Sequence, residues 1–186
     1  MSNIPNAAAR LRDLLRERSV RHGDFVLASG KRSTFYVDAR LTTMSGEGLV
    51  LIGLVGLEHI QARGWQPQLV GGLTLGADPV AYAIAATARA GGIALDAFTV
   101  RKQPKDHGTG RRIEGCFRPG GRVVVVEDVL TTGKSALEAI SAVEGERGQV
   151  LGVLTVVDRQ EGGRATLEEA GYPVEALVTA QELGLG

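Results

Sequence analysis

Two adjacent acidic residues, followed by a short run of hydroxyl side chains, form the stretch of this chain best suited to chemistry. Glu127 and Asp128 come directly after four valines, and residues 131–135 carry two threonines, a glycine, a lysine and a serine. A small-residue turn before a helix can present N–H groups and hydroxyls to a phosphate, aided by the helix dipole. The acidic pair would repel a phosphate, so we expect it to face ribose hydroxyls or a metal ion.

Two commoner phosphate-binding motifs do not fit this chain. Residues 133–135 resemble the end of a P-loop, but that motif requires a glycine five positions earlier, where Asp128 stands. Residues 108–110 resemble the start of a dinucleotide fingerprint, but Ile113 occupies the place of its last glycine. An ordinary buried strand that leads into a capped helix is the alternative interpretation of the acidic stretch.

The elements around the acidic pair predict an α/β fold. Residues 123–126 are β-branched and indicate a buried parallel strand that stops at the two carboxylates, with a helix continuing over 136–140. Strands and helices alternate elsewhere, which predicts a mostly parallel sheet with helices on both faces, and ligands bind beyond the carboxyl ends of such strands. The other predicted strands are 68–72, 93–100, 149–157 and 174–178, and the other predicted helices are 6–20 (ended by His22-Gly23), 46–63, 78–90 (with Asp78 as its N-cap), 163–170 and a final turn at 181–183.

A glycine-bearing loop at 73–77 repeats the strand–loop–helix arrangement and could offer amides to a second phosphate group.

Residues 25–40 read as two short strands around a polar turn, with Phe35, Tyr36 and Val37 in the second strand. This hairpin is either a plain sheet edge or a hood that brings an aromatic ring over a flat ligand. Arg159 follows another predicted strand, at its carboxyl end, where a guanidinium can hold a carboxylate or an imide edge bidentately.

The segment 101–112 is basic, polar and too long for a tight turn. Its cations include Arg101, Lys102, Lys105 and His107, which would repel one another until an anion neutralises them. Long polar segments inside compact domains are usually functional, although a solvated basic loop is the alternative.

Composition limits the class of protein. The 186 residues suit one domain with a substantial core, and Lys+Arg equals Asp+Glu at 21 each, so no overall field favours nucleic acid or an anionic membrane. The single cysteine, Cys116, excludes an internal disulfide and a cysteine-built zinc site. No apolar signal core or membrane span is visible, so we expect a cytoplasmic protein.

The stretch 127–135 resembles the phosphoribosyl-diphosphate (PRPP) signature of type I phosphoribosyltransferases. Three further stretches are similar to those of the orotate phosphoribosyltransferases within that family: 25–40 with its Ser29-Gly30 and Ser33, 101–108 with its Lys-Asp-His-Gly, and Asp158-Arg159-Gln160. The resemblance implies a type I phosphoribosyltransferase fold. It would form one domain over 1–186, with a small hood made by about 20–40 and the C-terminal segment.

The resemblance also implies a reaction and its partners. PRPP and orotate, with Mg²⁺, would give orotidine 5′-monophosphate and pyrophosphate, a step of pyrimidine (UMP) biosynthesis. PRPP would carry the metal, with no protein ligand assigned and Asp128 a candidate to contact it through water. The enzyme would be a homodimer with shared active sites, in which Lys102 acts across the interface, with no nucleic acid or membrane as partner.

The resemblance assigns roles to individual residues. The implied catalytic residues are Arg101, Lys102, Lys105 and His107. The implied PRPP-binding residues are these four together with Glu127, Asp128, Val129, Leu130, Thr131, Thr132, Gly133, Lys134 and Ser135. The implied orotate-binding residues are Tyr36, Val37, Thr131 and Arg159.

The chain departs from one common family pattern at two positions. Ala28 and Val80 stand where some members carry lysines, so Lys31, Arg32 or Arg40 would have to supply the missing charge. Two other functions fit the acidic signature: a phosphoribosyltransferase for another base and a non-catalytic PRPP-binding regulator. Arg159 favours a base that carries a carboxylate, and the cationic segment 101–112 favours an enzyme.

Overall fold

The computed structural model describes residues 6–26, 32–103 and 112–185. Its elements are α1 (Ala7–Ser19), β1 (Val20–Val26), β2 (Arg32–Val37), α2 (Arg40–Thr43), α3 (Gly46–Ala62), β3 (Leu69–Leu73), α4 (Ala77–Ala90), β4 (Asp96–Val100), β5 (Ile113–Gly115), β6 (Arg122–Leu130), α5 (Lys134–Gly145), β7 (Gln149–Asp158), α6 (Gly163–Glu169) and β8 (Val174–Thr179).

Within these ranges a six-stranded sheet runs in the order β5-β4-β3-β6-β7-β8, and β1 and β2 form a separate antiparallel hairpin. Every neighbouring pair in the large sheet is parallel except β4 and β5. This confirms the predicted α/β fold with a mostly parallel sheet.

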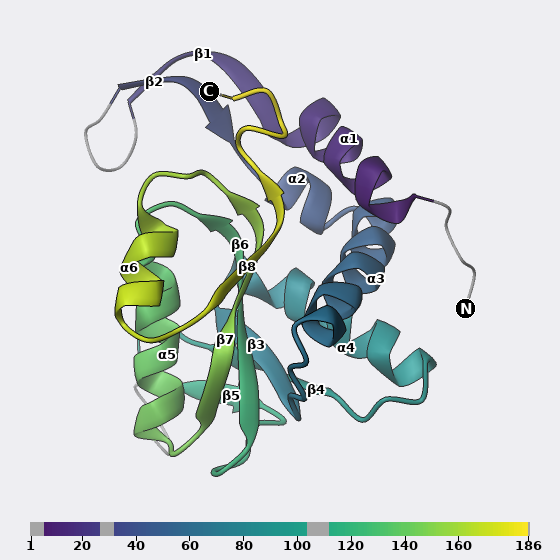
Figure 1. Cartoon of the computed structure of the whole chain (residues 1–186), viewed down its shortest axis with the longest axis vertical. Coiled ribbons are helices and arrows are strands. Elements are labelled where there is room, and N and C mark those ends of the chain that lie inside the picture. The colour runs from purple at the N-terminus through teal and green to yellow at the C-terminus, as the bar shows by residue number, and fades with distance from the viewer. Residues whose placement is uncertain (1–5, 27–31, 104–111, 186) are drawn as a thin grey trace.

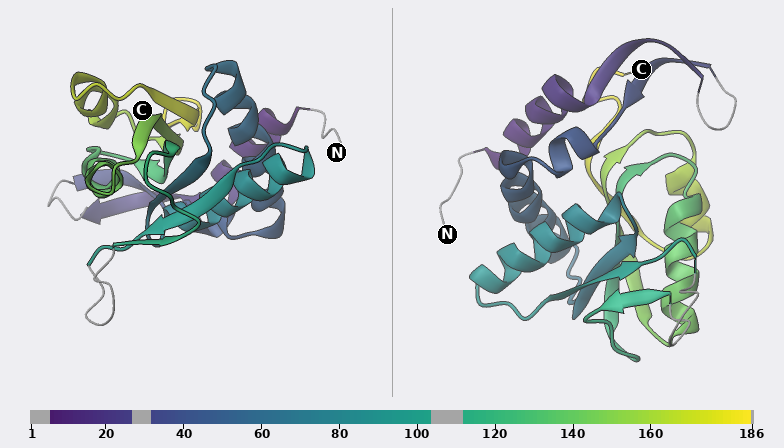
Figure 2. Two further views of the ribbon diagram at one scale, coloured as in Figure 1. Left: turned by 90° about the horizontal axis from the view of Figure 1, so that it is seen from below. Right: turned by 180° about the vertical axis from the view of Figure 1, so that it is seen from behind.

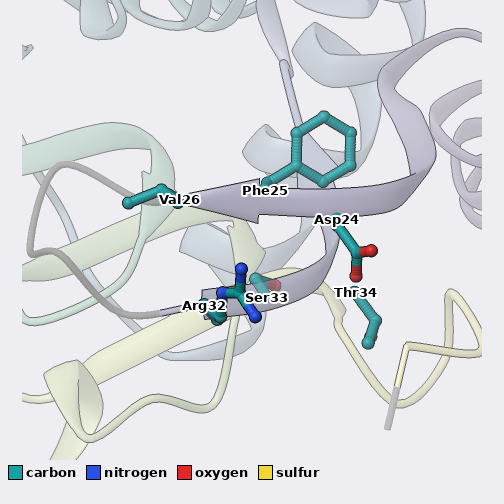
Figure 3. Close-up of a pocket in the computed structure, with 6 residues that line it drawn as sticks. All are labelled: Asp24, Phe25, Val26, Arg32, Ser33 and Thr34. Atoms are coloured by element: carbon teal, nitrogen blue, oxygen red, sulfur yellow. The ribbon is translucent and has the colours of Figure 1, made fainter.

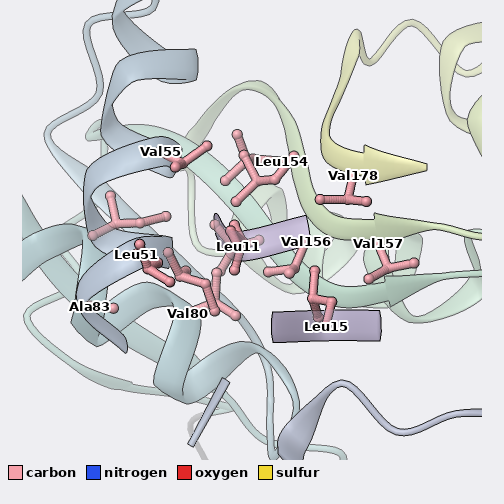
Figure 4. Close-up of a cluster of buried hydrophobic side chains, with 14 of the residues drawn as sticks. Leu11, Leu15, Leu51, Val55, Val80, Ala83, Leu154, Val156, Val157 and Val178 are labelled. Atoms are coloured by element: carbon pink, nitrogen blue, oxygen red, sulfur yellow. The ribbon is translucent and has the colours of Figure 1, made fainter. Parts of the chain in front are cut away.

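The valines of β6 divide the core between the two faces of the sheet. Side chains alternate along a strand, and Val124 and Val126 accordingly join one buried cluster with α1, α3 and α4 (Figure 4). Val123 and Val125 join the second cluster, with α5 and α6. Figures 1 and 2 show these two sets of helices on opposite sides of the sheet.

The N-terminal helix and the C-terminal turn pack together beside the β1–β2 hairpin (Figure 1). Leu11 and Leu15 of α1 are fully buried, in the same cluster as Leu183 and Leu185. Arg16 donates hydrogen bonds to the backbone carbonyl oxygens of Glu182 and Leu183. The two ends of the described chain therefore form one structural unit, which lies beside the β1–β2 hairpin.

Two element ends differ from the prediction because a neighbouring strand decides them. The first helix was expected to end at His22-Gly23, but it ends at Ser19, and Val20 is already extended and paired with Val37 of β2. The central strand was expected to stop at the acidic pair, but β6 continues through both acids to Leu130, because β7 pairs with it over this length.

The start of α4 and one edge of the sheet also differ from the prediction. Asp78 was expected to cap the helix, but α4 begins at Ala77, and the Asp78 carboxylate instead accepts hydrogen bonds from Thr74 and Thr99. The strand predicted at 93–100 begins at Asp96, and β5, which was not predicted, covers its outer edge.

None of the described helices combines the length and apolarity needed to cross a membrane.

Helix α4 packs directly against Gly53 of α3, which gives a test of the packing. A β-carbon at Gly53 would lie 2.7 Å from the carbonyl oxygen of Ala83 and would overlap the Thr87 hydroxyl, whereas one at Gly46 in the same helix would meet nothing within 4 Å. We expect Gly53→Ala to lower the free energy of unfolding by about 1–3 kcal/mol. Gly46→Ala, the matched control, should be neutral or stabilising by up to about 1 kcal/mol. Urea unfolding measures both, and equal effects would contradict this packing.

Candidate functional site

A cleft of about 680 Å³ lies at the carboxyl ends of β3, β6 and β7. The loops that follow β6 and β7 lie under the β1–β2 hairpin in Figures 1 and 2. The walls of the cleft come from four parts of the chain. These are residues 36–40 at the end of β2, residues 73–76 at the end of β3, the acidic pair with the turn after β6, and Arg159 and Glu161 after β7. The cleft is thus where parallel-sheet topology places ligands.

The two acids of β6 carry the strongest electrostatic perturbation in the cleft. Burial raises the pKa of Glu127 to about 8, the neighbouring Asp128 charge adds to this, and the N–H of Ala136, which donates to Glu127, opposes it. Burial also raises the pKa of Asp128, although the N–H of Val129 donates to Asp128 Oδ1 over 2.9 Å. Holding both carboxylates ionised here is unfavourable, so a bound cation or hydroxyl donors would be favoured.

The turn after the acids leads directly into α5, whose N-cap residue provides no side-chain cap. Gly133, the N-cap, has a φ of 82° and no side-chain cap, and its carbonyl oxygen accepts from Leu137 N. The turn is anchored at Thr131, whose carbonyl oxygen accepts from Gly163 N over 2.8 Å. The first N–H groups of a helix lack intrahelical partners and carry partial positive charge. An anion such as a phosphate therefore fits this end of the cleft.

The loop after β3 forms the opposite wall and is held by Asp78. Thr74 Oγ1 donates to Asp78 Oδ2 over 2.7 Å, and Thr99 Oγ1 donates to Asp78 Oδ1 over 2.8 Å. A β-carbon on Gly76 would lie 2.6 Å from Asp128 Cγ, so this close approach of loop and acid requires glycine. The peptide bond between Thr74 and Leu75 is cis.

Arg159 is a buried cation with two hydrogen-bond donors that are unpaired among the described residues. Its side chain is 5% exposed, and Nη2 lies 2.8 Å from Glu161 Oε1. At this separation the two groups form an ion pair, but the N–H bonds do not point at the carboxylate oxygen. Neither Nε nor Nη2 has a hydrogen-bond partner among the described residues. Phe35 covers the guanidinium face, with 4.8 Å from Cζ to the ring centroid. Buried unsatisfied donors are costly, so this site favours a ligand that brings acceptors.

Asp38 and Arg40 supply a second charged pair, at the cleft mouth. Arg40 Nε and Nη2 donate to the two oxygens of Asp38 over 2.8 and 3.0 Å, and these hydrogen bonds are the main cause of the lowered pKa of Asp38. The charge of Arg40 also reaches Asp128, whose ionised form it favours. Sequence reasoning considered Arg40 only as a substitute cation and missed Asp38; their two-residue spacing was the available signal.

The structure gathers most of the residues expected at the site. The cleft is lined by Tyr36, Val37, Lys102, Glu127, Asp128, Val129, Thr131, Thr132, Lys134, Ser135 and Arg159. Leu130 and Gly133 belong to the same strand and turn but are buried. Arg101 is directed elsewhere, with its Nε 3.0 Å from Glu114 Oε1. Lys105 and His107, and likewise Ala28 and Lys31, lie outside the described residues.

A smaller hollow of about 140 Å³ lies on the hairpin, between Asp24-Phe25 and Arg32-Ser33 (Figure 3). It shares no lining residue with the cleft. The Phe25 and Tyr36 rings pack across the hairpin with centroids 5.7 Å apart. This contact helps to fix Tyr36, the aromatic residue at the cleft.

Comparison with known proteins gives consistent relatives over nearly the whole chain. The chain is 46% identical over 177 residues to an orotate phosphoribosyltransferase of Aquifex aeolicus, covering 94% of this chain and 96% of the relative. It is 48% identical over 176 residues to one of Mycobacterium avium, covering 95% and 96%. A crystal structure of the Mycobacterium tuberculosis orotate phosphoribosyltransferase in complex with PRPP superposes with a TM-score of 0.81 at 42% identity, covering 96% of this chain and 99% of that one. No protein-family model matches the chain.

The raised pKa of Glu127 predicts a specific pH dependence of stability. A carboxyl whose folded pKa lies above its unfolded value binds more protons when folded, so the protein loses stability as pH rises from about 4.5 to about 8. Glu127→Gln keeps the acceptor for Ala136 N and removes the charge. We expect the stability of this variant relative to the parent to increase by roughly 1 kcal/mol or more between pH 6 and pH 9.

Urea unfolding of the ligand-free protein at both pH values measures this difference. Glu146→Gln removes the same charge from an exposed position and serves as control. A constant difference between Glu127→Gln and the parent across this range would contradict the buried, raised carboxyl.

Proposed function

This chain belongs to the orotate phosphoribosyltransferase family, and on that premise we propose which of its residues perform the reaction. The enzyme transfers the phosphoribosyl group of PRPP to orotate and gives orotidine 5′-monophosphate and pyrophosphate, in pyrimidine biosynthesis. The residue assignments below rest on the geometry of the cleft.

The observation that carries the assignment of orotate is the buried guanidinium of Arg159. Its Nε and Nη2 are shielded from water and lack hydrogen-bond acceptors among the described residues, although they belong to a residue that lines the cleft. The carboxylate of orotate is planar and can accept from both donors at once. Tyr36, Val37 and Thr131 line the same cleft and would lie beside the pyrimidine ring.

PRPP occupies the other side of the cleft in this proposal. Glu127 and Asp128 accept hydrogen bonds from the ribose hydroxyls, which removes the unfavourable isolation of two buried acids. The amides and hydroxyls from Leu130 to Ser135 bind the 5′-phosphate at the start of α5. The neighbouring ends of β6 and β7 would thus hold the sugar and the base next to each other.

Catalysis requires stabilisation of charge as the C1–O bond of PRPP breaks. Positive charge grows on the ribose and negative charge on the departing pyrophosphate, and fixed cations near the latter lower the barrier. Lys102 lines the cleft, whereas Arg101 would first have to leave Glu114. We assign the same function to Lys105 and His107, which lie outside the described residues. A segment that closes over the substrates would also exclude water, which hydrolyses the activated sugar.

The acidic pair also fits a role beside Mg²⁺. Carboxylate oxygens are ligands that Mg²⁺ accepts, usually one or two of them together with substrate phosphates and water. The described residues contain no group of three or more His, Cys, Asp or Glu side chains that could hold a metal alone. PRPP would therefore bring most of the ligands, with Asp128 contacting the ion through water, and the ion would neutralise charge on the leaving group.

An exposed apolar surface beside the cleft supports a homodimer. Leu41, Met44, Leu75 and Tyr82 are exposed large hydrophobic residues. A hollow of about 540 Å³ is lined by Leu41, Met44 and Leu75, and it shares Asp38, Arg40 and Leu75 with the cleft. Contiguous apolar surface of this kind marks an interface. A second copy on it would adjoin the active site, as expected if Lys102 acts across the interface.

We extend the proposal to the whole chain as one catalytic domain, with the hairpin and C-terminal turn as its hood. The contacts of α1 with the C-terminal turn support this assignment. A cytoplasmic location agrees with Cys116, which is free and exposed.

Two substitutions, one in each proposed subsite of the cleft, separate the binding of the two substrates. We expect Arg159→Ala to lower kcat/KM for orotate by about 100-fold or more, because a site built to bind a carboxylate loses its donors. The apparent affinity for PRPP should change little. Asp128→Asn should show the reverse pattern, because it weakens the ribose contacts.

Orotate consumption followed by ultraviolet absorbance, with PRPP and Mg²⁺ varied in turn, measures both variants. Arg118→Ala, which removes an exposed guanidinium paired with Asp96, is the control. Parallel assays with uracil, hypoxanthine and adenine test the base. Equal losses for both substrates in both variants would contradict the division of the cleft.

The dimer is tested by charging its proposed interface. Met44→Asp places a carboxylate in the apolar surface, so we expect light scattering to show a monomer where the parent protein shows a dimer. Ile93→Asp, another partly exposed apolar residue outside that surface, should leave the dimer intact. A parent protein that is monomeric at micromolar concentration would contradict the proposal.

A further inference from the structure

We infer that Glu161 and Phe35 are positioning residues that hold Arg159 from two sides and thereby set the affinity for orotate. The inference rests on the proposed function, in which Arg159 binds the substrate carboxylate. Neither residue was expected at the site from the sequence in this role.

The first step is the cost of the buried charge. The Arg159 side chain is 5% exposed, and a guanidinium removed from water needs a counter-charge to stay there. Glu161 supplies that charge from 2.8 Å away, and its own side chain is 24% exposed, so it remains partly solvated. Phe35 adds a cation–π contact on the flat face. Without these two contacts the guanidinium would be expected to turn toward water.

The second step is that Glu161 compensates the charge without using up the donors. Its carboxylate lies beside Nη2 but off the direction of the N–H bonds, so Nε and Nη2 make no hydrogen bond within the described part of the chain. A saturated guanidinium would have to break bonds before it could bind a substrate. Arg159 is instead held in place with these two donors unpaired, so a planar carboxylate that reaches them has no protein hydrogen bond to displace.

The third step is the backbone that carries both members of the ion pair. Gln160, between them, has a φ of 57°, in the left-handed region that few side chains adopt. Asp158 Oδ1 accepts from Gln160 N over 2.8 Å, and Asp158 Oδ2 lies 3.1 Å from Arg164 Nε. Gln160 Oε1 in turn accepts from Gln181 N. These bonds fix the bend that brings Glu161 back to Arg159.

The test separates binding of orotate from the chemical step. We expect Glu161→Gln to raise KM for orotate about 10-fold, which corresponds to roughly 1.4 kcal/mol, because ordering the guanidinium then opposes binding. kcat and KM for PRPP should stay within about twofold, because the variant leaves the transition-state contacts in place. Glu161→Asp, which restores the charge on a shorter side chain, should recover part of the affinity.

A second variant tests the contact of Phe35 with Arg159. Phe35→Leu should also raise KM for orotate. The double variant should have a smaller effect than the product of the two single effects, because both residues act through Arg159. Glu168→Gln removes a carboxylate from an exposed ion pair with Arg164 and is the matched control. Thermal unfolding verifies that each variant is folded, and Phe35→Leu and Glu161→Asp keep the test available if Glu161→Gln does not fold.

The outcomes distinguish this inference from the proposed function. A parent protein that fails to consume orotate would overturn the function itself. If the parent consumes orotate, two results would contradict the inference that Glu161 and Phe35 position Arg159. One is that Glu161→Gln leaves the KM for orotate unchanged or lowers it. The other is that it raises the KM values for orotate and PRPP equally. A lower KM would mean that Glu161 competes with the substrate for Arg159.

Discussion

The structure depends on ionisable side chains that are buried before any ligand arrives. Glu127 and Asp128 lie on β6, which stands between β3 and β7 in the sheet. Burial is the main reason that the pKa of each acid is raised. Arg159 is buried at the end of the next strand. A side chain on a loop could turn toward water, whereas residues fixed at the ends of packed strands cannot do so freely. The packing of the sheet thus keeps these ionisable groups buried, which is unfavourable. In the proposal, bound substrates supply the partners that offset this cost.

Adjacent strands also keep the two signs of charge apart. Leu130 of β6 is paired with Asp158 of β7, so the acids and Arg159 belong to neighbouring strands, whose axes lie about 4.8 Å apart. Arg159 nevertheless makes its ion pair with Glu161. In the proposal, the acids therefore stay available for a sugar and a metal ion, and the guanidinium stays available for a carboxylated base. Neighbouring strands with separate partners are a simple way to place two substrates side by side.

Local sequence was sufficient where the chemistry is local. The acidic pair, the turn before α5 and Arg159 could be predicted because strand, turn and helix signals stand next to the functional residues. The continuation of β6 through Glu127 and Asp128 could not, because pairing with β7 decides it. The same holds for the bond of Asp78 to Thr99 and for Phe35 over Arg159, which join residues distant in sequence. Lys105 and His107 stay predictions from the family resemblance.

The side of the cleft proposed to bind orotate is built by segments that are distant in sequence, and this makes its geometry a property of the whole fold. Phe35 reaches Arg159 from the hairpin, and Gln181 holds Gln160 from the C-terminal turn. The C-terminal turn is in turn attached to α1 by Arg16. A guanidinium aligned by such distant elements keeps its direction only while they remain packed together. In the proposal, recognition of orotate is for this reason coupled to the packing of the hairpin, whereas the turn between β6 and α5 is held by Gly163 at the start of α6.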